Sequence, residues 1–449
     1  MTVRFGFIPV KPKFLLSEEA LDQIVGSYML ALERMGGERW SDETLENPAP
    51  LFYLIATGGT EEVLLNLRAE RNKAVPDEPV FLLAHPAHNS LPASLEVLAR
   101  LQQDREQGRI FYLQGPEDET GFSQIEATVR HQNGPLKAMG RHQNGPLKVM
   151  GRHQNGPLEP KVRDMEVRLA LRQARIGLVG APSDWLVASS PDPATVQGTW
   201  GPEVVPIAMD EITQALEAVP SETVASILEP LVTDATEVRE PAQTELEEVV
   251  RVYVALKQAV ERHELDAITV RCFDLVHDLQ TTGCFGLAQL TDEGVIAGCE
   301  GDLVSTVGML WAYMLLGQIP WMANPAQLDE ASNTLWLAHC TVPRRVVQDY
   351  GLRSHFESGL GVGIQGTLPN GPVTLLRIGG TAMDRIWLAE GEILQAGDAE
   401  DLCRTQAQVR LTHGQVQDLL RAPLGNHLIL VNGRHSDRLR AWWETMIAQ

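Results

Sequence analysis

The sequence has little positive charge. Its 37 Lys and Arg residues stand against 59 Asp and Glu residues, which gives a formal net charge of −22. A surface this negative repels phosphate backbones and anionic lipid headgroups, so we expect neither a nucleic acid nor a membrane among its partners. The chain also lacks the GxSxG, HExxH and Walker patterns. A serine hydrolase, a zinc protease and a P-loop nucleotide site are therefore not predicted.

Cysteine is scarce as well. The five cysteines form no CxxC pair and their number is odd, which favours free thiols in a reducing compartment. The first residues, MTVRFGFIPVKPKF, do not have the charge-then-apolar order of a secretory signal. The apolar stretch 306–323 contains glycine and proline, so we expect a buried helix and a buried strand rather than a membrane span. These features predict a cytoplasmic protein.

The chain has enough length and apolar content for several folded domains. It contains 449 residues, of which 44% are hydrophobic. Apolar runs alternate with helix-length segments up to residue 333, a pattern typical of parallel sheets with helices on both faces. After residue 333, short strands follow one another with few helices between them. We predict two doubly wound, Rossmann-like α/β domains at 1–170 and 171–333, and a mainly antiparallel β domain at 334–449.

An 11-residue unit that begins RHQNGPL occurs almost three times between residues 130 and 160. Each copy contains Asn-Gly-Pro, which breaks helices, and the unit is too short and polar to stack its own core. We expect an insert in the first domain, lying in a surface loop or beside a helix. Its histidines could bind metal loosely, but polar repeats are usually solvated linkers.

Polar residues follow the strands predicted between residues 267 and 340. They are Asp274, Glu300, Asp302, Asn324 and His339. In parallel sheets, ligand sites form beyond the carboxyl ends of the strands, so these side chains are expected to converge. Hard divalent cations such as Mg²⁺ and Mn²⁺ favour oxygen ligands with some imidazole. A carboxylate beside such a cation can also act as a general acid or base.

Most of these residues have an ordinary structural explanation when taken alone. Asp302 starts a predicted helix and could be its N-cap. His339 could be a buried histidine with satisfied hydrogen bonds, and Asn324 could be a turn residue. Glu300 is harder to explain, because it lies between an apolar run and a nearly uncharged helix. A carboxylate in such a place is unfavourable unless it is paired or bound to a metal.

Four segments of the chain resemble the superfamily of L-fucose and L-arabinose isomerases. They are GCEGDLVSTVGMLWAYMLLG, IPWMAN, WLAHC and GNHLILVNGRH, and they occur in the order of that family. The resemblance implies that Glu300 and His427 are metal ligands and that His339 contacts the substrate or the metal. It also implies the order of two α/β domains and one β-rich domain.

The resemblance implies a reaction, a cofactor and an assembly. The reaction is aldose–ketose isomerisation of a monosaccharide through a cis-enediol, with Glu300 as ligand and base. The cofactor is Mn²⁺, with Mg²⁺ or Co²⁺ as alternatives. The assembly is a homo-oligomer, a trimer or hexamer with sites between subunits. Candidate substrates are fucose-like or arabinose-like sugars, or the anionic sulfoquinovose, whose isomerases resemble this family.

The chain departs from the resembled family at Asn324, which stands where fucose isomerases have a metal-binding aspartate. An amide can ligate a metal through its carbonyl oxygen, but it cannot take a proton at neutral pH. The second acid or base must then be Asp302, Glu357 or a metal-bound water. The same departure leaves a second hypothesis open, a non-catalytic or altered relative that binds a sugar or a protein partner.

Other polar segments are candidates for substrate contacts. ATGGT and AHPAHNS follow predicted strands of the first domain and contain Thr57, His85, His88 and Asn89. GAPSDW ends the strand RIGLV and is expected to line the same cleft. An anionic head group would need a guanidinium. Arg404 is the candidate that we place in the site, and the other available guanidinium groups are those of Arg271, Arg377 and Arg434.

Overall fold

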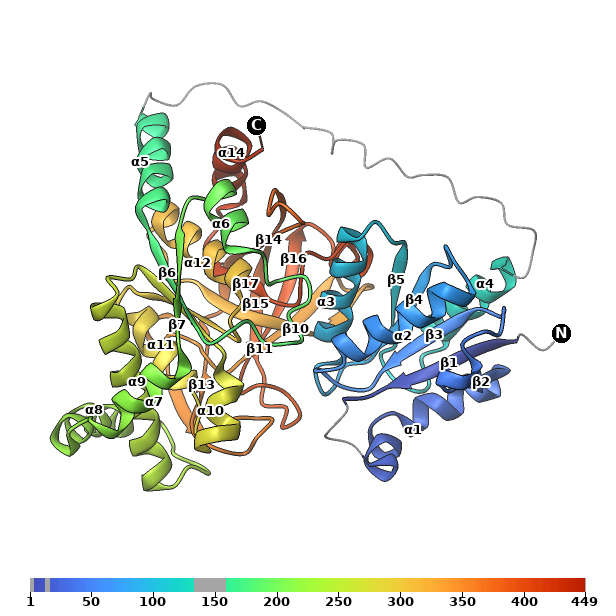
Figure 1. Ribbon diagram of the computed structural model, residues 1–449, viewed down its shortest axis with the longest axis horizontal. Helices are drawn as coiled ribbons and strands as arrows, with labels where there is room; N and C mark the ends of the chain where they lie inside the picture. The colour runs from blue at the N-terminus through green and yellow to red at the C-terminus, as the bar shows by residue number, and fades with distance from the viewer. Residues whose placement is uncertain (1–3, 13–16, 133–158, 449) are drawn as a thin grey trace.

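The computed structural model describes residues 4–12, 17–132 and 159–448. It is a mixed α/β structure with two parallel sheets and an antiparallel barrel (Figure 1). This confirms the predicted combination of parallel α/β units with an antiparallel β unit, while the doubly wound arrangement and the three domain boundaries stay predictions. Most of the 11-residue repeat, residues 133–158, lies outside the described residues, so the expectation for it stays a prediction too.

The first parallel sheet is formed by the N-terminal part of the chain. Its order is β2 (Gly37–Arg39), β1 (Phe5–Val10), β3 (Leu51–Ile55), β4 (Val80–Ala84) and β5 (Gly108–Tyr112). Every residue of β3 and β4 is buried, as expected when helices cover both faces of a parallel sheet. Its helices are α1 (Glu18–Arg34), α2 (Glu61–Ala74), α3 (Ser90–Gln103) and α4 (Glu119–Gln132), with a 3₁₀ turn at Asp42–Thr44.

The helix α3 has an unusual place in this unit. It contacts the first sheet on one side and the barrel on the other, and Figure 1 shows it between them. Its residues are buried along nearly the whole length of the helix. A helix buried on all sides is expected to be mostly apolar, and the fully buried part of SLPASLEVLARLQQ contains only small hydroxyl residues and one charged residue, Glu96, besides its apolar ones.

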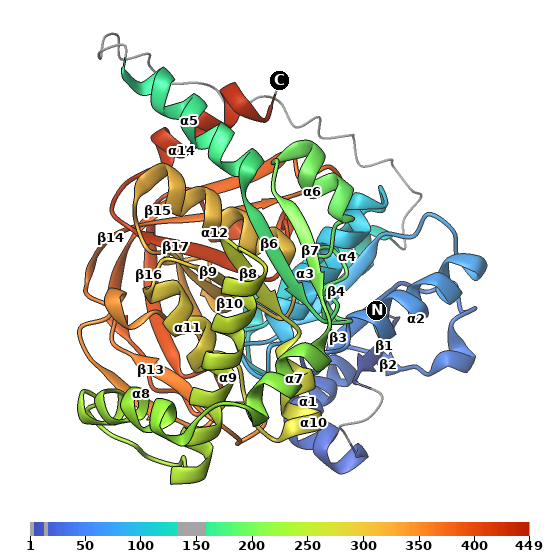
Figure 2. The same ribbon diagram turned by 60° about the vertical axis from the view of Figure 1, so that its left-hand side comes forward.

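The second parallel sheet has the order β7 (Glu203–Ile207), β6 (Arg175–Val179), β8 (Ala267–Val270) and β9 (Ile296–Cys299). Its helix α12 contacts both this sheet and barrel strands, so it joins the two units (Figure 2). The helices of this part are α5 (Glu159–Gln173), α6 (Pro193–Thr199), α7 (Met209–Glu217), α8 (Ser221–Thr233), α9 (Gln243–Arg262), α10 (Cys272–Leu279), α11 (Cys284–Asp292) and α12 (Leu303–Leu316).

The antiparallel strands close into a barrel. Its order is β10 (Trp321–Asp329), β11 (Thr334–His339), β16 (Thr405–His413), β15 (Arg385–Ala396), β14 (Gly371–Gly379) and β17 (Leu428–Asn432). The strand β10 precedes residue 333, the predicted domain boundary, yet it pairs with β11 and β17 of the barrel. The remaining elements are a 3₁₀ turn at Arg344–Val346, β12 (Tyr350–Arg353), β13 (Gly363–Gly366), α13 (Val416–Arg421) and α14 (Ser436–Met446).

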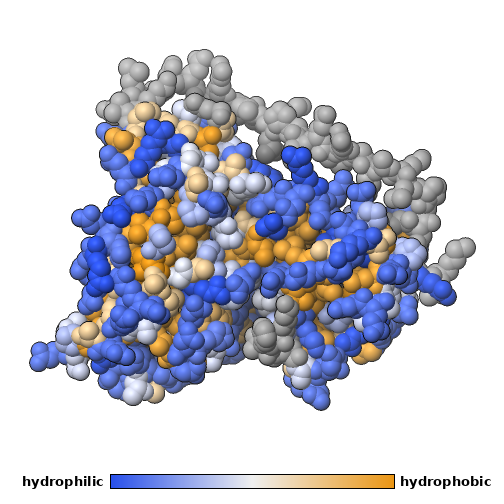
Figure 3. Space-filling model, viewed as in Figure 1, coloured by the Kyte–Doolittle hydropathy of each residue, from blue (hydrophilic) through white to orange (hydrophobic). Residues whose placement is uncertain are grey.

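The apolar stretch 306–323 is the rest of α12 followed by the start of β10, as predicted. Within the part of the chain that the structure describes, no helix is both long and apolar enough to cross a membrane. Hydrophilic residues cover most of the face shown in Figure 3, and hydrophobic ones gather toward its middle.

We expect the packing of α3 between the first sheet and the barrel to be important for stability. Leu95 is fully buried in α3, so Leu95→Ala should lower the free energy of unfolding by about 2–5 kcal/mol through lost burial and a residual cavity. Leu30→Ala in α1, where the leucine is 55% exposed, should change it by less than about 0.5 kcal/mol. Urea unfolding followed by circular dichroism measures both values, and equal values would contradict the buried position of α3.

Candidate functional site

The chain makes a tight turn where β9 ends, and this turn positions two carboxylates. Glu300 and Gly301 have φ angles of 65° and 77°, in the left-handed region that few side chains adopt. A Cβ on Gly301 would lie 2.7 Å from Pro182 Cα, so the position requires glycine. The backbone N–H of Ser183 donates to the carbonyl of Glu300 at 2.8 Å, which holds the turn. A strained, non-glycine residue held in this way is frequently functional.

The Glu300 side chain faces the imidazole of His427 across the interface between the second sheet and the barrel. Its Oε1 lies 3.8 Å from His427 Nε2. Its Oε2 accepts a hydrogen bond from Trp185 Nε1 at 2.7 Å, so the GAPSDW segment does contact this cluster. His427 Nε2 is buried and has no hydrogen-bond partner among the described residues. Such an unsatisfied buried nitrogen is unfavourable unless a ligand completes it.

Asp302 fixes the other ring nitrogen of His427. Its Oδ2 lies 2.9 Å from His427 Nδ1 and 3.2 Å from Arg377 Nη1, and all three side chains are buried. Asp302 is also the N-cap of α12, because its Oδ1 accepts the backbone N–H of Ser305 at 2.7 Å. The ordinary explanation for this residue, helix capping, is therefore correct. Capping is one of two roles, since the same carboxylate also orients the imidazole.

The charges of this group shift the pKa values of its members. Burial alone would raise the pKa of Asp302, but Arg377 and His427 hold it below its ordinary value. Burial alone would lower the pKa of His427, but the carboxylates of Glu300 and Asp302 raise it. Asp302 is thus a fixed anion, which makes it a poor candidate for accepting and returning protons near neutral pH.

His339 ends β11 beside His427. The two rings lie 5.4 Å apart, and His339 Nδ1 is 2.8 Å from the Thr341 hydroxyl. Burial and the neighbouring His427 lower the pKa of His339 to about 3, so its ring is neutral near pH 7. A neutral imidazole can either ligate a metal or hydrogen-bond to a sugar oxygen.

Asn324 lies on the neighbouring strand β10, paired with Ala338, the residue before His339. It is 6% exposed, and its Oδ1 has no partner within the described ranges. Asn324 Oδ1 and His427 Nε2 are therefore both buried and without a hydrogen-bond partner among the described residues, and both atoms have a lone pair that can coordinate a cation. Carboxylate, amide and imidazole donors together are suited to Mn²⁺ or Mg²⁺.

The nearby sulfur atoms widen this donor set. A carboxylate oxygen of Glu300, a ring nitrogen of His339 and Cys299 Sγ lie within 4.8 Å of one another. Cys299 Sγ is also 3.1 Å from Cys272 Sγ, in a buried pair of free thiols. The contact with Cys272 and burial raise the pKa of Cys299 above its ordinary value, so it is a neutral thiol and a weak ligand.

A third carboxylate, that of Glu357, approaches from the loop between β12 and β13. Asn89, in the first unit of the same chain, donates to Glu357 Oε1 at 2.5 Å. Partial loss of hydration at the carboxyl group and the charge of Glu300 raise the pKa of Glu357, which is itself exposed to solvent. The structure thus brings Asn89, Glu357 and Glu300 toward one another from three parts of the chain.

The other predicted contact residues have partners within the protein. Thr57 donates to the carbonyl of Gly58 at 2.9 Å. His85 is buried, stacks on Tyr28 and lies with Nε2 at 3.1 Å from the carbonyl of Ala56. Arg404 donates to the Ser354 carbonyl at 2.8 Å and to Glu400 at 3.2 Å. Within the described part of the chain, no hydrogen bond or ion pair links these three residues to Glu300, and their substrate role stays a prediction.

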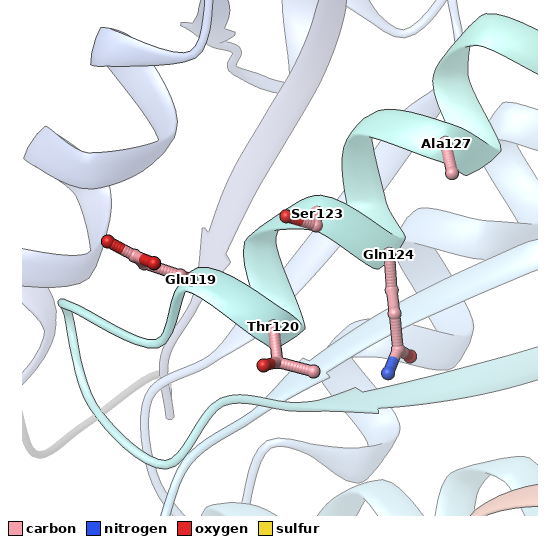
Figure 4. Close-up of a pocket in the computed structure, with 5 residues that line it drawn as sticks. All are labelled: Glu119, Thr120, Ser123, Gln124 and Ala127. Atoms are coloured by element: carbon pink, nitrogen blue, oxygen red, sulfur yellow. The ribbon is translucent and has the colours of Figure 1, made fainter.

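Two residues of this region, Glu61 and Glu96, were not predicted from the sequence to be functional, and Trp185 was predicted only as part of the GAPSDW segment. Glu61, in the first turn of α2, is 2% exposed, and its Oε2 is unpaired within the described part of the chain. Burial and the charges of Glu96, Glu300 and Glu357 raise its pKa. A different surface pocket lies on α4 (Figure 4). It has a single carboxylate, that of Glu119, and no imidazole or thiol, so we place the candidate site at Glu300.

The candidate site thus places a carboxylate at the end of a parallel strand, that of Glu300, beside the imidazoles of His339 and His427 on an antiparallel barrel. No protein-family model matches the chain. The sulfoquinovose isomerase of Priestia aryabhattai is 25% identical over 194 residues, which cover 41% of this chain and 43% of the relative. That of Alkalicoccus urumqiensis is 22% identical over 288 residues, covering 62% and 64%.

A third relative, the sulfoquinovose isomerase of a Clostridium species, is 33% identical over 92 residues, 20% of this chain and 21% of the relative. All three alignments span less than two thirds of the relatives' length. At these identities, the similarities confirm the predicted resemblance to the fucose and arabinose isomerase superfamily and nothing narrower.

Acid should destabilise the protein partly through His85. Burial lowers the pKa of His85 from 6.5 to about 4, so the folded state keeps this ring neutral while the unfolded state takes up a proton below pH 6.5. Stability is therefore lost as the pH falls from about 6.5 to 4, by up to about 3 kcal/mol from this ring.

Urea unfolding midpoints between pH 7 and pH 4.5 measure this contribution. His85→Gln should weaken the pH dependence, and His413→Gln, which changes an exposed histidine, should leave it unchanged. Parallel pH curves for the wild type and His85→Gln would contradict the assignment.

Proposed function

We propose that the chain is an aldose–ketose isomerase for a monosaccharide and that it uses a divalent cation, Mn²⁺ first, with Mg²⁺ or Co²⁺ as alternatives. The observation that carries the proposal is the buried Nε2 of His427, which has no partner among the described residues and faces the Glu300 carboxylate at 3.8 Å. The similarity to sulfoquinovose isomerases supports the reaction class.

Glu300, His427 and the amide oxygen of Asn324 would hold the cation, with His339 beside them. When bound, a divalent cation supplies Lewis-acid polarisation of the sugar carbonyl and offsets negative charge that develops on its oxygen. This offset is needed because Glu61, Glu300 and Glu357 act on one another as like charges.

The reaction moves one proton between two neighbouring carbon atoms of the open-chain sugar. The carboxylate of Glu300 takes the proton from C2, the C–H electron pair forms the C1–C2 double bond, and O1 gains a proton. In the second half, the hydroxyl at O2 loses its proton, the C2 carbonyl forms, and Glu300 returns its proton to C1. The hydrogen bond from Trp185 to Oε2 holds the Glu300 side chain in place for this transfer.

We assign the proton exchange between O1 and O2 to Glu357 rather than to Asp302. Asn324 cannot take a proton, and Asp302 is committed to Arg377 and His427. The raised pKa of Glu357 brings its carboxyl closer to the range in which a group can both donate and accept a proton. His339 is assigned as a hydrogen-bond donor to a sugar oxygen.

The non-catalytic alternative, a relative that only binds a sugar, is motivated by Asn324. It predicts sugar binding without conversion to the ketose, and an assay for the ketose separates the two functions.

The remaining features of the proposal are the assembly and the compartment. We propose a homo-oligomer, a trimer or hexamer, in which a neighbouring subunit completes the site. The contact between Asn89 and Glu357 adds that the first unit of the same chain also reaches the site. The five free cysteines support a reducing compartment such as the cytoplasm.

Removing the Glu300 carboxylate should abolish isomerisation. Glu300→Gln keeps the shape of the side chain but loses the base, so the ketose-forming rate should fall at least about 10³-fold. Removing the cation with EDTA should have a similar effect, which added Mn²⁺ reverses. The matched control is Glu330→Gln in the turn between β10 and β11, where the glutamate is exposed. Full activity of Glu300→Gln would exclude the proposed mechanism.

A panel of sulfoquinovose, L-fucose and L-arabinose tests the substrate class. On the similarity to its relatives, we expect sulfoquinovose to be converted most efficiently. If sugars without a sulfonate react better, the substrate is a neutral sugar. If none of the sugars yields a ketose but one of them binds, the non-catalytic alternative holds. Chromatography of the products measures conversion, and calorimetry measures binding.

A further inference from the structure

Glu96 is a carboxylate enclosed in the middle of the molecule. It lies on α3, is 0% exposed, and is the acidic residue of an otherwise apolar stretch of this helix. Burying a carboxylate is costly unless several donors replace its water. Such a residue therefore needs a structural or functional reason, and the proposed reaction does not use it directly.

Three donors satisfy Glu96, and they come from two other parts of the chain. Its Oε1 accepts the backbone N–H of Ala188 at 2.7 Å. Its Oε2 accepts the hydroxyl of Ser189 at 2.8 Å and the backbone N–H of Asn426 at 3.0 Å. Ala188 and Ser189 follow β6 of the second sheet, and Asn426 immediately precedes His427, the residue before β17. The carboxylate of Glu96 thus connects the N-terminal unit to the second α/β unit and to the barrel, the two parts that supply Glu300 and His427.

A second path leads from Glu96 to His427 through side chains. The Ser189 hydroxyl, while donating to Glu96, accepts a hydrogen bond from Arg377 Nη2 at 2.5 Å. The other terminal nitrogen of Arg377 donates to Asp302, and Asp302 accepts from His427 Nδ1. These five side chains are at most 1% exposed, so water cannot replace any of the links.

The two paths meet at the imidazole whose Nε2 faces Glu300. One sets the backbone position of His427 through Asn426, and the other sets the ring through Arg377 and Asp302. Groups that orient a metal-binding histidine in this way typically change metal affinity about 10–100-fold when they are removed.

We propose that Glu96 is a positioning residue that orients His427 and thereby sets the affinity of the site for its divalent cation. This inference rests on the proposed function, because it takes Glu300 and His427 as the ligands. If Glu96 has this role, the docking of α3 is a condition for cation binding by Glu300 of the second α/β unit and His427 of the barrel.

The test measures Mn²⁺ binding by the full chain in the absence of sugar. Protein stripped with EDTA is titrated with Mn²⁺, and the free ion is quantified by electron paramagnetic resonance. Glu96→Gln should weaken binding about 10–100-fold, because the amide presents two N–H donors to groups that are themselves donors. The control Glu62→Gln, an exposed position on α2, should bind as the wild type does.

A second variant covers the case in which Glu96→Gln does not fold. Ser189→Ala removes the link to Arg377 but keeps both backbone N–H contacts of Glu96, so we expect a smaller loss, about 3–10-fold. Melting of the metal-free proteins reports whether either variant is folded. A purely structural role for Glu96 would lower the melting temperature without changing the Mn²⁺ affinity of the folded protein.

The outcomes separate this inference from the function on which it rests. If the wild type takes up no Mn²⁺, the proposed function is lost. If the wild type binds Mn²⁺ and the folded variants bind it equally well, the role of Glu96 is excluded while the isomerase proposal stands. Weaker binding by both variants, with binding by Glu62→Gln unchanged, supports the inference.

Discussion

The buried carboxylate of Asp302 is the interaction on which the candidate site depends. It caps α12 of the second α/β unit, pairs with Arg377 of the barrel and fixes Nδ1 of His427. Removing one partner from a buried group of this kind typically costs about 3–5 kcal/mol, because the remaining charge is left without compensation. The same contacts therefore hold the barrel against the second α/β unit and position the side chains of the candidate site.

Much of the fold could be predicted because its strands are local apolar runs. The apolar runs 51–56, 79–84 and 175–179 predict strands, and β3, β4 and β6 begin and end within one residue of them. The strand β2 was not predicted, because GER is short and polar and owes its pairing to β1. The pairing of β10 with β11 and β17 was not predictable either, since a hydrophobic pattern identifies a strand but not its neighbours.

The candidate site was predictable in part, through residues that carry chemistry at strand ends. Glu300 was selected by its apolar surroundings and by resemblance, and His427 by resemblance alone. The structure brings them within 3.8 Å of each other. Glu96 was missed, although an acid inside an apolar helix is a readable signal. Its donors are two backbone N–H groups and one hydroxyl from distant segments, and no local pattern encodes such a convergence. Trp185 was missed as an individual residue for the same reason.

The strand pairing of the barrel has a consequence for the ions that could enter the site. Asn324 lies on β10, which is hydrogen-bonded on one side to β11, ending in His339, and on the other to β17, beginning one residue after His427. The side chains of Asn324, His339 and His427 thus extend from three neighbouring, hydrogen-bonded strands or from the residue next to one. Such a frame resists expansion, because widening it means breaking backbone pairs. Ca²⁺, with its larger radius and its need for six to eight oxygen atoms, is poorly matched to a rigid mount of this kind.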